Sequence, residues 1–218
     1  HIAGEFWGDM DSLVRFANLH NIYVIEDSAQ AMGAVQNGKQ AGSYGVAGCF
    51  SFYPAKILGA YGDSGGLTTN DKEVYEEVKE LRNHYKKDYS KWGINSRLDN
   101  LQAAILNVRF KYLPYMLAMR DDIARTYINK LEGVIYLPEP TEGRVLQDFI
   151  VRTEKRDELY DFLKSEGVET MKNEYPFPIE KERQSLRYEA ETLRLPCNEN
   201  LTPKEIDYVV KKVKEFYV

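Results

Sequence analysis

The chain has 218 residues, which is enough to bury one sizeable hydrophobic core or two modest ones. Charged residues make up 29% of it and the net charge is −5, so the basic footprint of a nucleic-acid-binding protein is absent. No apolar run approaches the ~20 residues of a membrane span, and no signal sequence opens the chain. Two cysteines far apart in sequence and three histidines without metal-ligand spacing complete this pattern, so we expect a cytoplasmic protein with no membrane contact and no metal site.

The first element predicted along the chain is an amphipathic helix over residues 9–20. Leu13, Phe16 and Ala17 lie on one face at helical spacing. Asp9 or Asp11 precedes the apolar residues as an N-cap. Asn21 lies near the predicted C-cap.

A short buried strand follows at residues 22–26 and ends in two carboxylates, Glu26 and Asp27. Open α/β sheets bind ligands beyond the carboxyl ends of their strands, and Asp27 falls there. The alternative is that both carboxylates cap the next turn. We favour that alternative for Glu26 and a ligand-binding role for Asp27. The glycine-rich stretch 33–48 has little periodicity and is predicted to be a loop with at most one short edge strand.

The segment from Ser51 to Lys56 is the strongest chemical signal. Residues 47–53 and 65–69 are predicted strands around it, and glycines are frequent in residues 59–66. A lysine at the mouth of a buried strand suits a covalent bond between its amine and a phosphorylated aldehyde. The serine hydroxyl and the backbone N–H groups can receive the phosphate. An ordinary solvated lysine is the alternative interpretation.

The helices that follow suggest the fold class. Asp71 is a predicted N-cap for a helix with Val74, Val78 and Leu81 on one side. This alternation of strands and helices favours an α/β fold with a mainly parallel sheet. Asp99 is predicted to cap a further helix that runs to residue 112. Its expected inward residues are Leu101, Ala104, Ile105 and Val108.

The remainder of the chain has a different pattern. Pro114 either kinks the preceding helix or starts a second one that ends near Gly133. Thr202, Pro203 and Glu205 form a capping box that opens a last amphipathic helix. The other predicted elements are strands at 134–137, 148–153 and 194–195 and a helix at 155–166. We expect two domains, residues 1–112 and a small α+β domain at residues 113–218.

Several motifs occur in a fixed order along the chain. They are Glu26-Asp27-x-Ala29-Gln30, Gly42-Ser43-x-Gly45, Phe50-Ser51-Phe52-Tyr53-Pro54-Ala55-Lys56-x-Leu58-Gly59, Gly62-Asp63 and Gly93-x-Asn95-Ser96-Arg97-Leu98-Asp99. In this order the chain resembles the DegT/DnrJ/EryC1/StrS family, pyridoxal-phosphate enzymes of aminotransferase fold type I that mostly act on nucleotide-linked keto sugars.

The resemblance implies an aminotransferase of deoxyamino sugar biosynthesis. Its cofactor would be pyridoxal 5'-phosphate, its amino donor glutamate or a similar compound, its acceptor a nucleotide-linked keto sugar, and its assembly a homodimer. Family members are longer than this chain, which lacks an initiating Met. We therefore interpret it as the C-terminal portion of such an enzyme. Residues 1–112 would be the C-terminal half of the cofactor-binding large domain.

The resemblance also assigns roles within the cofactor site. Lys56 would hold the cofactor and transfer a proton between the substrate and the cofactor. Asp27 would pair with the pyridinium nitrogen. Gln30 would donate to the phenolic oxygen of the ring, and Ser51 would bind the phosphate. Asn95 would reach the phosphate from the partner subunit.

Substrate contacts are expected from Tyr61, beside the lysine loop, from Arg97, whose charge suits an anion, and from His84. The alternatives for the last two are an arginine paired with a carboxylate such as Asp99 and a histidine at a solvated helix end. Three other functions stay open at this point. They are a catalytically incomplete fragment or interaction module, a cofactor-binding regulator, and a lyase or dehydratase of the same family.

Overall fold

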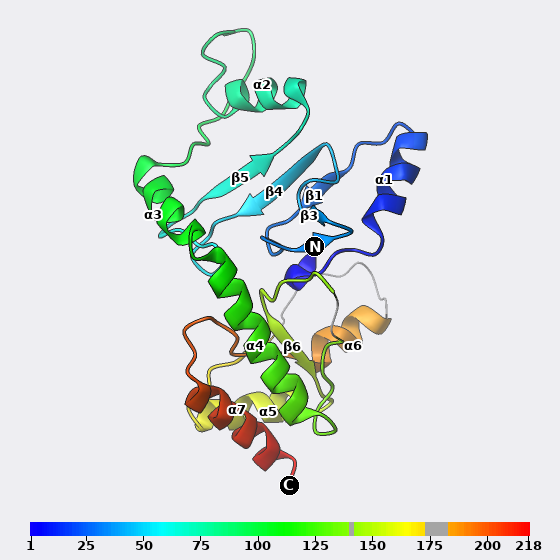
Figure 1. The fold of residues 1–218 in the computed structure, drawn as a ribbon, viewed down its shortest axis with the longest axis vertical. Coiled ribbons are helices and arrows are strands. Elements are labelled where there is room, and N and C mark those ends of the chain that lie inside the picture. The colour runs from blue at the N-terminus through cyan, green and yellow to red at the C-terminus, as the bar shows by residue number, and fades with distance from the viewer. Residues whose placement is uncertain (140–141, 173–182) are drawn as a thin grey trace. The chain divides into compact units, whose positions relative to one another are not determined.

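The computed structural model describes residues 1–139, 142–172 and 183–218, and these form two compact units that are taken separately (Figure 1). Within the described residues, the N-terminal unit contains 1–117 and 142–147, and the C-terminal unit contains 118–139, 148–172 and 183–218. The segment 142–147 therefore packs with the first unit although it follows residue 112 by a long stretch of chain. None of the described helices is both long and apolar enough to cross a membrane.

The N-terminal unit is built on a mixed three-stranded sheet in the order β1-β4-β5. β1 (Ile25–Asp27) runs parallel to β4 (Ala47–Ser51), with Asp27 opposite Cys49. β5 (Gly65–Thr68) is antiparallel to β4. The α/β fold is confirmed, and β5 departs from the parallel arrangement because a loop rather than a crossover helix joins it to β4.

A small hairpin occupies part of the stretch predicted to be a loop. β2 (Val35–Gln36) pairs with β3 (Lys39–Gln40). Between them Asn37 and Gly38 have φ angles of 51° and 76°. Positive φ at both central residues is the requirement of a type I′ turn, for which Asn-Gly is the preferred pair. The Asn-Gly dipeptide was therefore a hairpin signal that the interpretation as a loop missed.

The predicted helix starts in this unit agree with the structure. Asp9 and Asp71 are the N-caps of their helices, and each accepts hydrogen bonds from two backbone N–H groups of the first turn. Asp99 precedes a helix without making such a bond. Pro114 starts a second helix instead of kinking the one before it, and that helix ends shortly before Gly133. The helices that begin in this unit are the 3-10 turn η1 (Ile2–Gly4), α1 (Met10–Leu19), α2 (Lys72–Leu81), α3 (Asn100–Phe110) and α4 (Leu113–Leu131). The residues of α4 from 118 on belong to the C-terminal unit.

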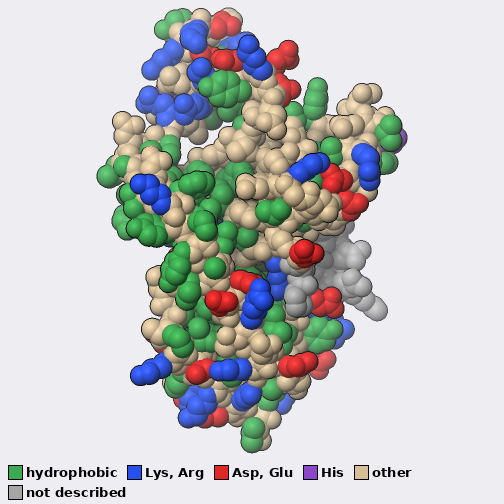
Figure 2. Space-filling view, in the orientation of Figure 1, with side chains coloured by type: hydrophobic (Ala, Val, Ile, Leu, Met, Phe, Trp, Pro, Cys, Tyr) green, Lys and Arg blue, Asp and Glu red, His purple; other side chains and the backbone are tan. Residues whose placement is uncertain are grey.

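The predicted inward face of α3 is wrong. Leu101 and Val108 are 71% and 56% exposed, whereas Leu106 is buried. Figure 2 shows hydrophobic side chains gathered over this helix. The helix has apolar residues on more than one side, so periodicity alone selected the wrong stripe.

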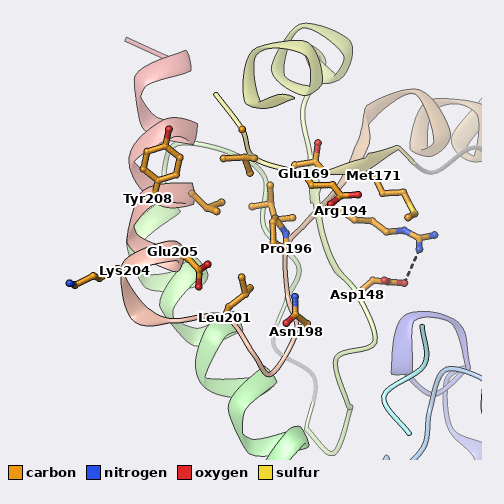
Figure 3. Close-up of a pocket in the computed structure, with 15 residues that line it drawn as sticks. Asp148, Glu169, Met171, Arg194, Pro196, Asn198, Leu201, Lys204, Glu205 and Tyr208 are labelled. Atoms are coloured by element: carbon orange, nitrogen blue, oxygen red, sulfur yellow. Dashed lines mark ion pairs between the residues drawn. The ribbon is translucent and has the colours of Figure 1, made fainter. Parts of the chain in front are cut away.

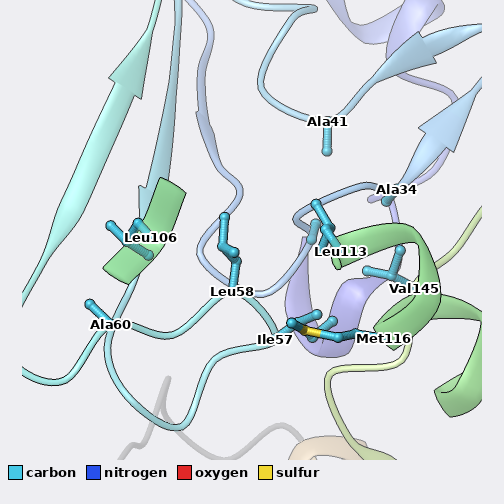
Figure 4. Packing of buried hydrophobic residues seen from close by; sticks show 10 residues of the cluster. Ala34, Ala41, Ile57, Leu58, Ala60, Leu106, Leu113, Met116 and Val145 are labelled. Atoms are coloured by element: carbon cyan, nitrogen blue, oxygen red, sulfur yellow. The ribbon is translucent and has the colours of Figure 1, made fainter. Parts of the chain in front are cut away.

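Buried apolar side chains from distant segments form the core of the N-terminal unit (Figure 4). Ile57 and Leu58, directly after Lys56, are 1% and 3% exposed. Burying side chains of this size stabilises a fold by about 1.5–3 kcal/mol each, which anchors the backbone that carries the lysine. The cluster consists of Ala31, Ala34, Ala41, Ile57, Leu58, Ala60, Leu106, Leu113, Met116 and Val145.

The C-terminal unit contains an antiparallel sheet in the order β6-β8-β7. The capping box of its last helix is confirmed: Thr202 Oγ1 accepts from Glu205 N, and the Glu205 carboxylate accepts from Thr202 N at 2.8 Å. The strand predicted at 134–137 is wrong, since only an isolated bridge joins Tyr136 to Arg152 there. The elements are β6 (Phe149–Arg152), α5 (Arg156–Ser165), β7 (Met171–Lys172), α6 (Arg183–Glu191), β8 (Thr192–Leu195) and α7 (Pro203–Phe216).

Candidate active site

A cavity of about 280 Å³ lies at the carboxyl ends of β1 and β4 in the N-terminal unit. The register of the parallel pair brings Asp27 beside Cys49, so Ser51 lies farther along the same edge. This is the edge at which open α/β sheets bind their ligands. Two of the predicted site residues, Asp27 and Ser51, therefore share one cavity. Its lining consists of Ile25, Asp27, Ala29, Cys49, Phe50 and Ser51.

Asp27 presents a carboxylate with one oxygen fixed by the backbone. Its Oδ1 accepts a hydrogen bond from Ala29 N at 3.1 Å, which orients the side chain. The described residues form no hydrogen bond to its Oδ2. A carboxylate that is held by one oxygen and open at the other can accept a hydrogen bond from a ligand.

The Ser51 hydroxyl has a hydrogen that it can donate to a ligand. Its Oγ accepts from Tyr53 N at 3.3 Å, and the O–H hydrogen itself is donated to no group that the structure describes. Ser51 ends β4, opposite Gly65 on β5. The hydroxyl therefore lies at a strand end with its proton available for an anion.

Lys56 lies in the turn that follows, and its backbone is held on both sides. Its N–H donates to the carbonyl oxygen of Tyr53 at 2.8 Å, and the next two side chains are core residues. Its own side chain is half-buried and is not part of the lining of the cavity. The structure thus brings Asp27 and Ser51 together and fixes the backbone of Lys56 five residues beyond the serine.

Glu26 does not cap the next turn, and that prediction is wrong. It is 3% exposed, and its carboxylate accepts from the backbone N–H groups of Gly42, Tyr44 and Gly45 at 2.8, 2.6 and 2.8 Å. His1 Nε2 lies 3.1 Å from the same carboxylate. The bond to the next turn comes instead from Asp27. Glu26 therefore holds the loop at residues 42–45 in place. Within that loop, burial raises the pKa of the Tyr44 hydroxyl.

Gln30 uses part of its side chain inside the fold. Its Oε1 accepts from Ala3 N at 2.6 Å, which leaves the NH₂ group as the end that can donate to a ligand. The predicted role of Gln30 requires a donor, so the orientation is compatible with it. The role stays a prediction.

The remaining predicted residues do not line the cavity. Tyr61 is 75% exposed, and its backbone N–H donates to Gln102. His84 is exposed and has a φ of 66°, with its N–H donating to Ile94 O at 3.1 Å. Asn95 Oδ1 accepts from Arg97 Nε at 3.4 Å. The expected roles of these side chains stay predictions.

Gln147 is a residue of this region that the sequence did not single out. Its Nε2 donates to Ala55 O at 3.0 Å, and its Oε1 accepts from Ile57 N at 3.2 Å. Both partners adjoin Lys56. The contact joins segments about ninety residues apart, and no local pattern signals it.

A larger cavity of about 570 Å³ lies in the C-terminal unit, beside the start of α7 (Figure 3). Several of its polar side chains are engaged in the fold. Arg194 pairs with Asp148 at 3.1 Å, Glu205 belongs to the capping box, and the Tyr208 hydroxyl donates to Glu166 O. We therefore place the candidate site at the smaller cavity, where Asp27 and Ser51 retain groups for a ligand.

Comparison with known proteins identifies the family of the chain. Residues 1–214 match the model of the DegT/DnrJ/EryC1/StrS aminotransferase family. A "pleiotropic regulatory protein" of Geobacillus stearothermophilus is 40% identical over 100% of this chain and 64% of its own length. A dTDP-3-amino-3,6-dideoxy-alpha-D-galactopyranose transaminase of Aneurinibacillus thermoaerophilus is 38% identical over 99% and 64%.

Among solved structures, S. venezuelae DesV in complex with a ketimine intermediate superposes with a TM-score of 0.92 at 33% identity. The match covers 100% of this chain and 63% of that chain. The chain thus spans less than two thirds of the length of these relatives.

Proposed function

Because the chain belongs to the DegT/DnrJ/EryC1/StrS aminotransferase family, we propose that the protein is a pyridoxal-phosphate-dependent aminotransferase of nucleotide-linked keto sugars. The amino donor would be glutamate or a similar amino acid. The names of the transaminase relatives support the substrate class. The single observation that carries the proposal is the shared cavity of Asp27 and Ser51, the latter five residues before a lysine whose backbone is anchored.

The residues at the cavity fit pyridoxal phosphate. The Oδ2 oxygen of Asp27 is open to a protonated ring nitrogen, and the Ser51 hydroxyl can donate to a phosphate oxygen. Ile25, Ala29 and Phe50 supply apolar surface for a ring between these two ends. An acid at one end, an anion-binding donor at the other and apolar walls between them match the chemical parts of this cofactor.

When bound, pyridoxal phosphate supplies an electron-withdrawing ring that stabilises negative charge on the substrate carbon. Asp27 would keep the ring nitrogen protonated by offering it a carboxylate. Lys56 would provide the amine that holds the cofactor and would serve as base and acid at the substrate carbon. Ser51 would hold the phosphate, and Gln30, whose Oε1 accepts from Ala3 N, would donate through its NH₂ group to the phenolic oxygen.

Four exposed residues of the N-terminal unit are proposed to contact the substrate or the cofactor of a partner subunit. Asn95 would reach the cofactor phosphate of the partner subunit in an isologous homodimer. Arg97 would contact an anionic substrate group. Tyr61 and His84 would contact the substrate from the lysine loop and from the end of α2. Their exposure supports this proposal, since each side chain is accessible to a ligand or a partner subunit.

Two measurements on the full-length protein test the function. Incubation with pyridoxal phosphate and reduction with borohydride should label Lys56, as mapped by peptide mass. Lys56→Ala should abolish this label, and Lys72→Ala, which removes an exposed lysine of α2, should not. Transfer of ¹⁵N from labelled glutamate to dTDP- and UDP-linked keto sugars should then be detectable by mass spectrometry. Absence of label at Lys56, or label without transfer to any such sugar, would refute the proposal.

A further inference from the structure

The side-chain amide of Gln147 forms hydrogen bonds with the backbone on both sides of Lys56. Gln147 Nε2 donates to Ala55 O at 3.0 Å, and its Oε1 accepts from Ile57 N at 3.2 Å. The carbonyl belongs to the residue before the lysine and the N–H to the residue after it. A planar amide bound at both ends holds two peptide groups at a fixed separation, which restricts the backbone dihedrals between them.

Other contacts restrain the same backbone. The Lys56 N–H donates to Tyr53 O at 2.8 Å, and Ile57 O accepts from Arg109 Nη2 at 3.4 Å. The side chain of Ile57 is 1% exposed. The lysine side chain itself is only half-buried. The backbone of Lys56 is therefore more restrained than its side chain, an arrangement that directs the Cα–Cβ bond and leaves the amine free to react.

Gln147 is itself held in place. The two residues before it, Val145 and Leu146, are 7% and 6% exposed, and Val145 N donates to Gly4 O at 3.1 Å. The side chain that binds the backbone on both sides of Lys56 therefore belongs to a fixed segment of the N-terminal unit. This matters because a restraint positions a reacting group only when its own support is fixed.

We propose that Gln147 is a positioning residue for Lys56. The two hydrogen bonds of Gln147 to the peptide groups on either side of Lys56 orient the lysine side chain toward the aldehyde of pyridoxal phosphate. The inference rests on the proposed function, in which Lys56 bonds pyridoxal phosphate. Gln147 touches neither cofactor nor substrate in this role. It acts through the direction of the lysine side chain, and misplacing a reacting group costs reactivity even when the chemistry of the group is unchanged.

The same unit offers a matched control. Gln36 makes the same pair of bonds elsewhere: its Nε2 donates to Gly8 O at 2.9 Å, and its Oε1 accepts from Met10 N at 3.0 Å. Gln36→Met and Gln147→Met each remove two backbone hydrogen bonds and keep a side chain of similar length. A merely structural role of Gln147 predicts similar losses of thermal stability in the two variants and no effect particular to Lys56.

The test is competitive labelling of the full-length protein with pyridoxal phosphate. The lysine amine attacks the aldehyde carbon, one water leaves with the carbonyl oxygen, and borohydride delivers hydride to the carbon–nitrogen double bond. Peptide mass mapping gives the ratio of label on Lys56 to label on exposed Lys72. We expect this ratio to fall about tenfold in Gln147→Met, in line with the cost of misaligned reacting groups, and to stay at the wild-type value in Gln36→Met.

The failures are distinguishable. If wild-type protein shows no preference for Lys56 over Lys72, the proposed function fails. If wild type shows the preference and Gln147→Met keeps it, the positioning role is overturned. Gln147→Glu serves where the methionine variant does not fold. It retains an acceptor for Ile57 N and loses the donor to Ala55 O. An unchanged labelling ratio in this variant therefore also overturns the proposal that both hydrogen bonds position Lys56.

Discussion

Glu26→Gln should destabilise the N-terminal unit by about 2–4 kcal/mol. In the native structure one carboxylate oxygen accepts from Tyr44 N and Gly45 N, and the other accepts from Gly42 N. Glutamine keeps the shape but replaces one oxygen by an NH₂ group. The less costly orientation places that group against the N–H of Gly42. An unsatisfied buried N–H costs about 1–3 kcal/mol, and the other two bonds lose their charge-assisted strength.

Urea unfolding at neutral pH, followed by far-UV circular dichroism, measures the change. Glu76→Gln on the exposed side of α2 is the control, because its partner Lys79 lies 3.7 Å away with both side chains about half exposed. We expect the control to lie within about 0.5 kcal/mol of wild type. A Glu26→Gln variant that unfolds at the same urea concentration as Glu76→Gln would refute the view that this carboxylate holds the 42–45 loop.

Three further outcomes are expected. Thr202→Ala should cost about 1 kcal/mol at pH 7 by loss of the N-cap. Hydrogen bonds from the backbone N–H and from the hydroxyl of Thr202 lower the pKa of Glu205. Alanine keeps the backbone bond and removes the hydroxyl bond, so this part of the cost is full above pH 4.5 and is lost as pH falls through the lower folded-state value; an equal cost at pH 7 and pH 3 in urea unfolding would contradict this. Tyr85→Phe should remove a phenolate ionisation near pH 12 from the absorbance titration, because the hydrogen bond to Glu77 raises the pKa of Tyr85 to about 12, and loss of amplitude near pH 10 instead would be the wrong result. Gly42→Ala should lower the thermal midpoint, since φ is +83° and the added Cβ would lie 2.4 Å from a ring carbon on β4; an unchanged midpoint would show that the loop can relax.

The helix starts were predictable because their signals are local. Asp9, Asp71 and Thr202 each cap the helix that the sequence assigned to them. An N-cap needs only a short polar side chain and the next three backbone N–H groups, all within one turn. Such a signal does not depend on the rest of the fold.

The buried face of a helix was harder to predict, as α3 shows. Leu101 was assigned inward and is 71% exposed, whereas Leu106 is buried in the cluster with Ile57 and Leu58. Periodicity reports that apolar residues share a stripe. It does not report which neighbouring segment the stripe meets, and that depends on contacts between residues far apart in sequence.

The site residues divide by where their polar atoms point. Glu26 and Gln147 direct theirs to the backbone of distant loops, and Gln30 directs its oxygen to Ala3. A lone pair or hydrogen engaged in this way is not available to a ligand, whatever motif the residue belongs to. Asp27 retains an oxygen and Ser51 a hydroxyl proton at the cavity. A motif therefore mixes residues that keep groups for a ligand with residues that hold neighbouring loops, and only the hydrogen-bond partners in the folded chain separate the two groups.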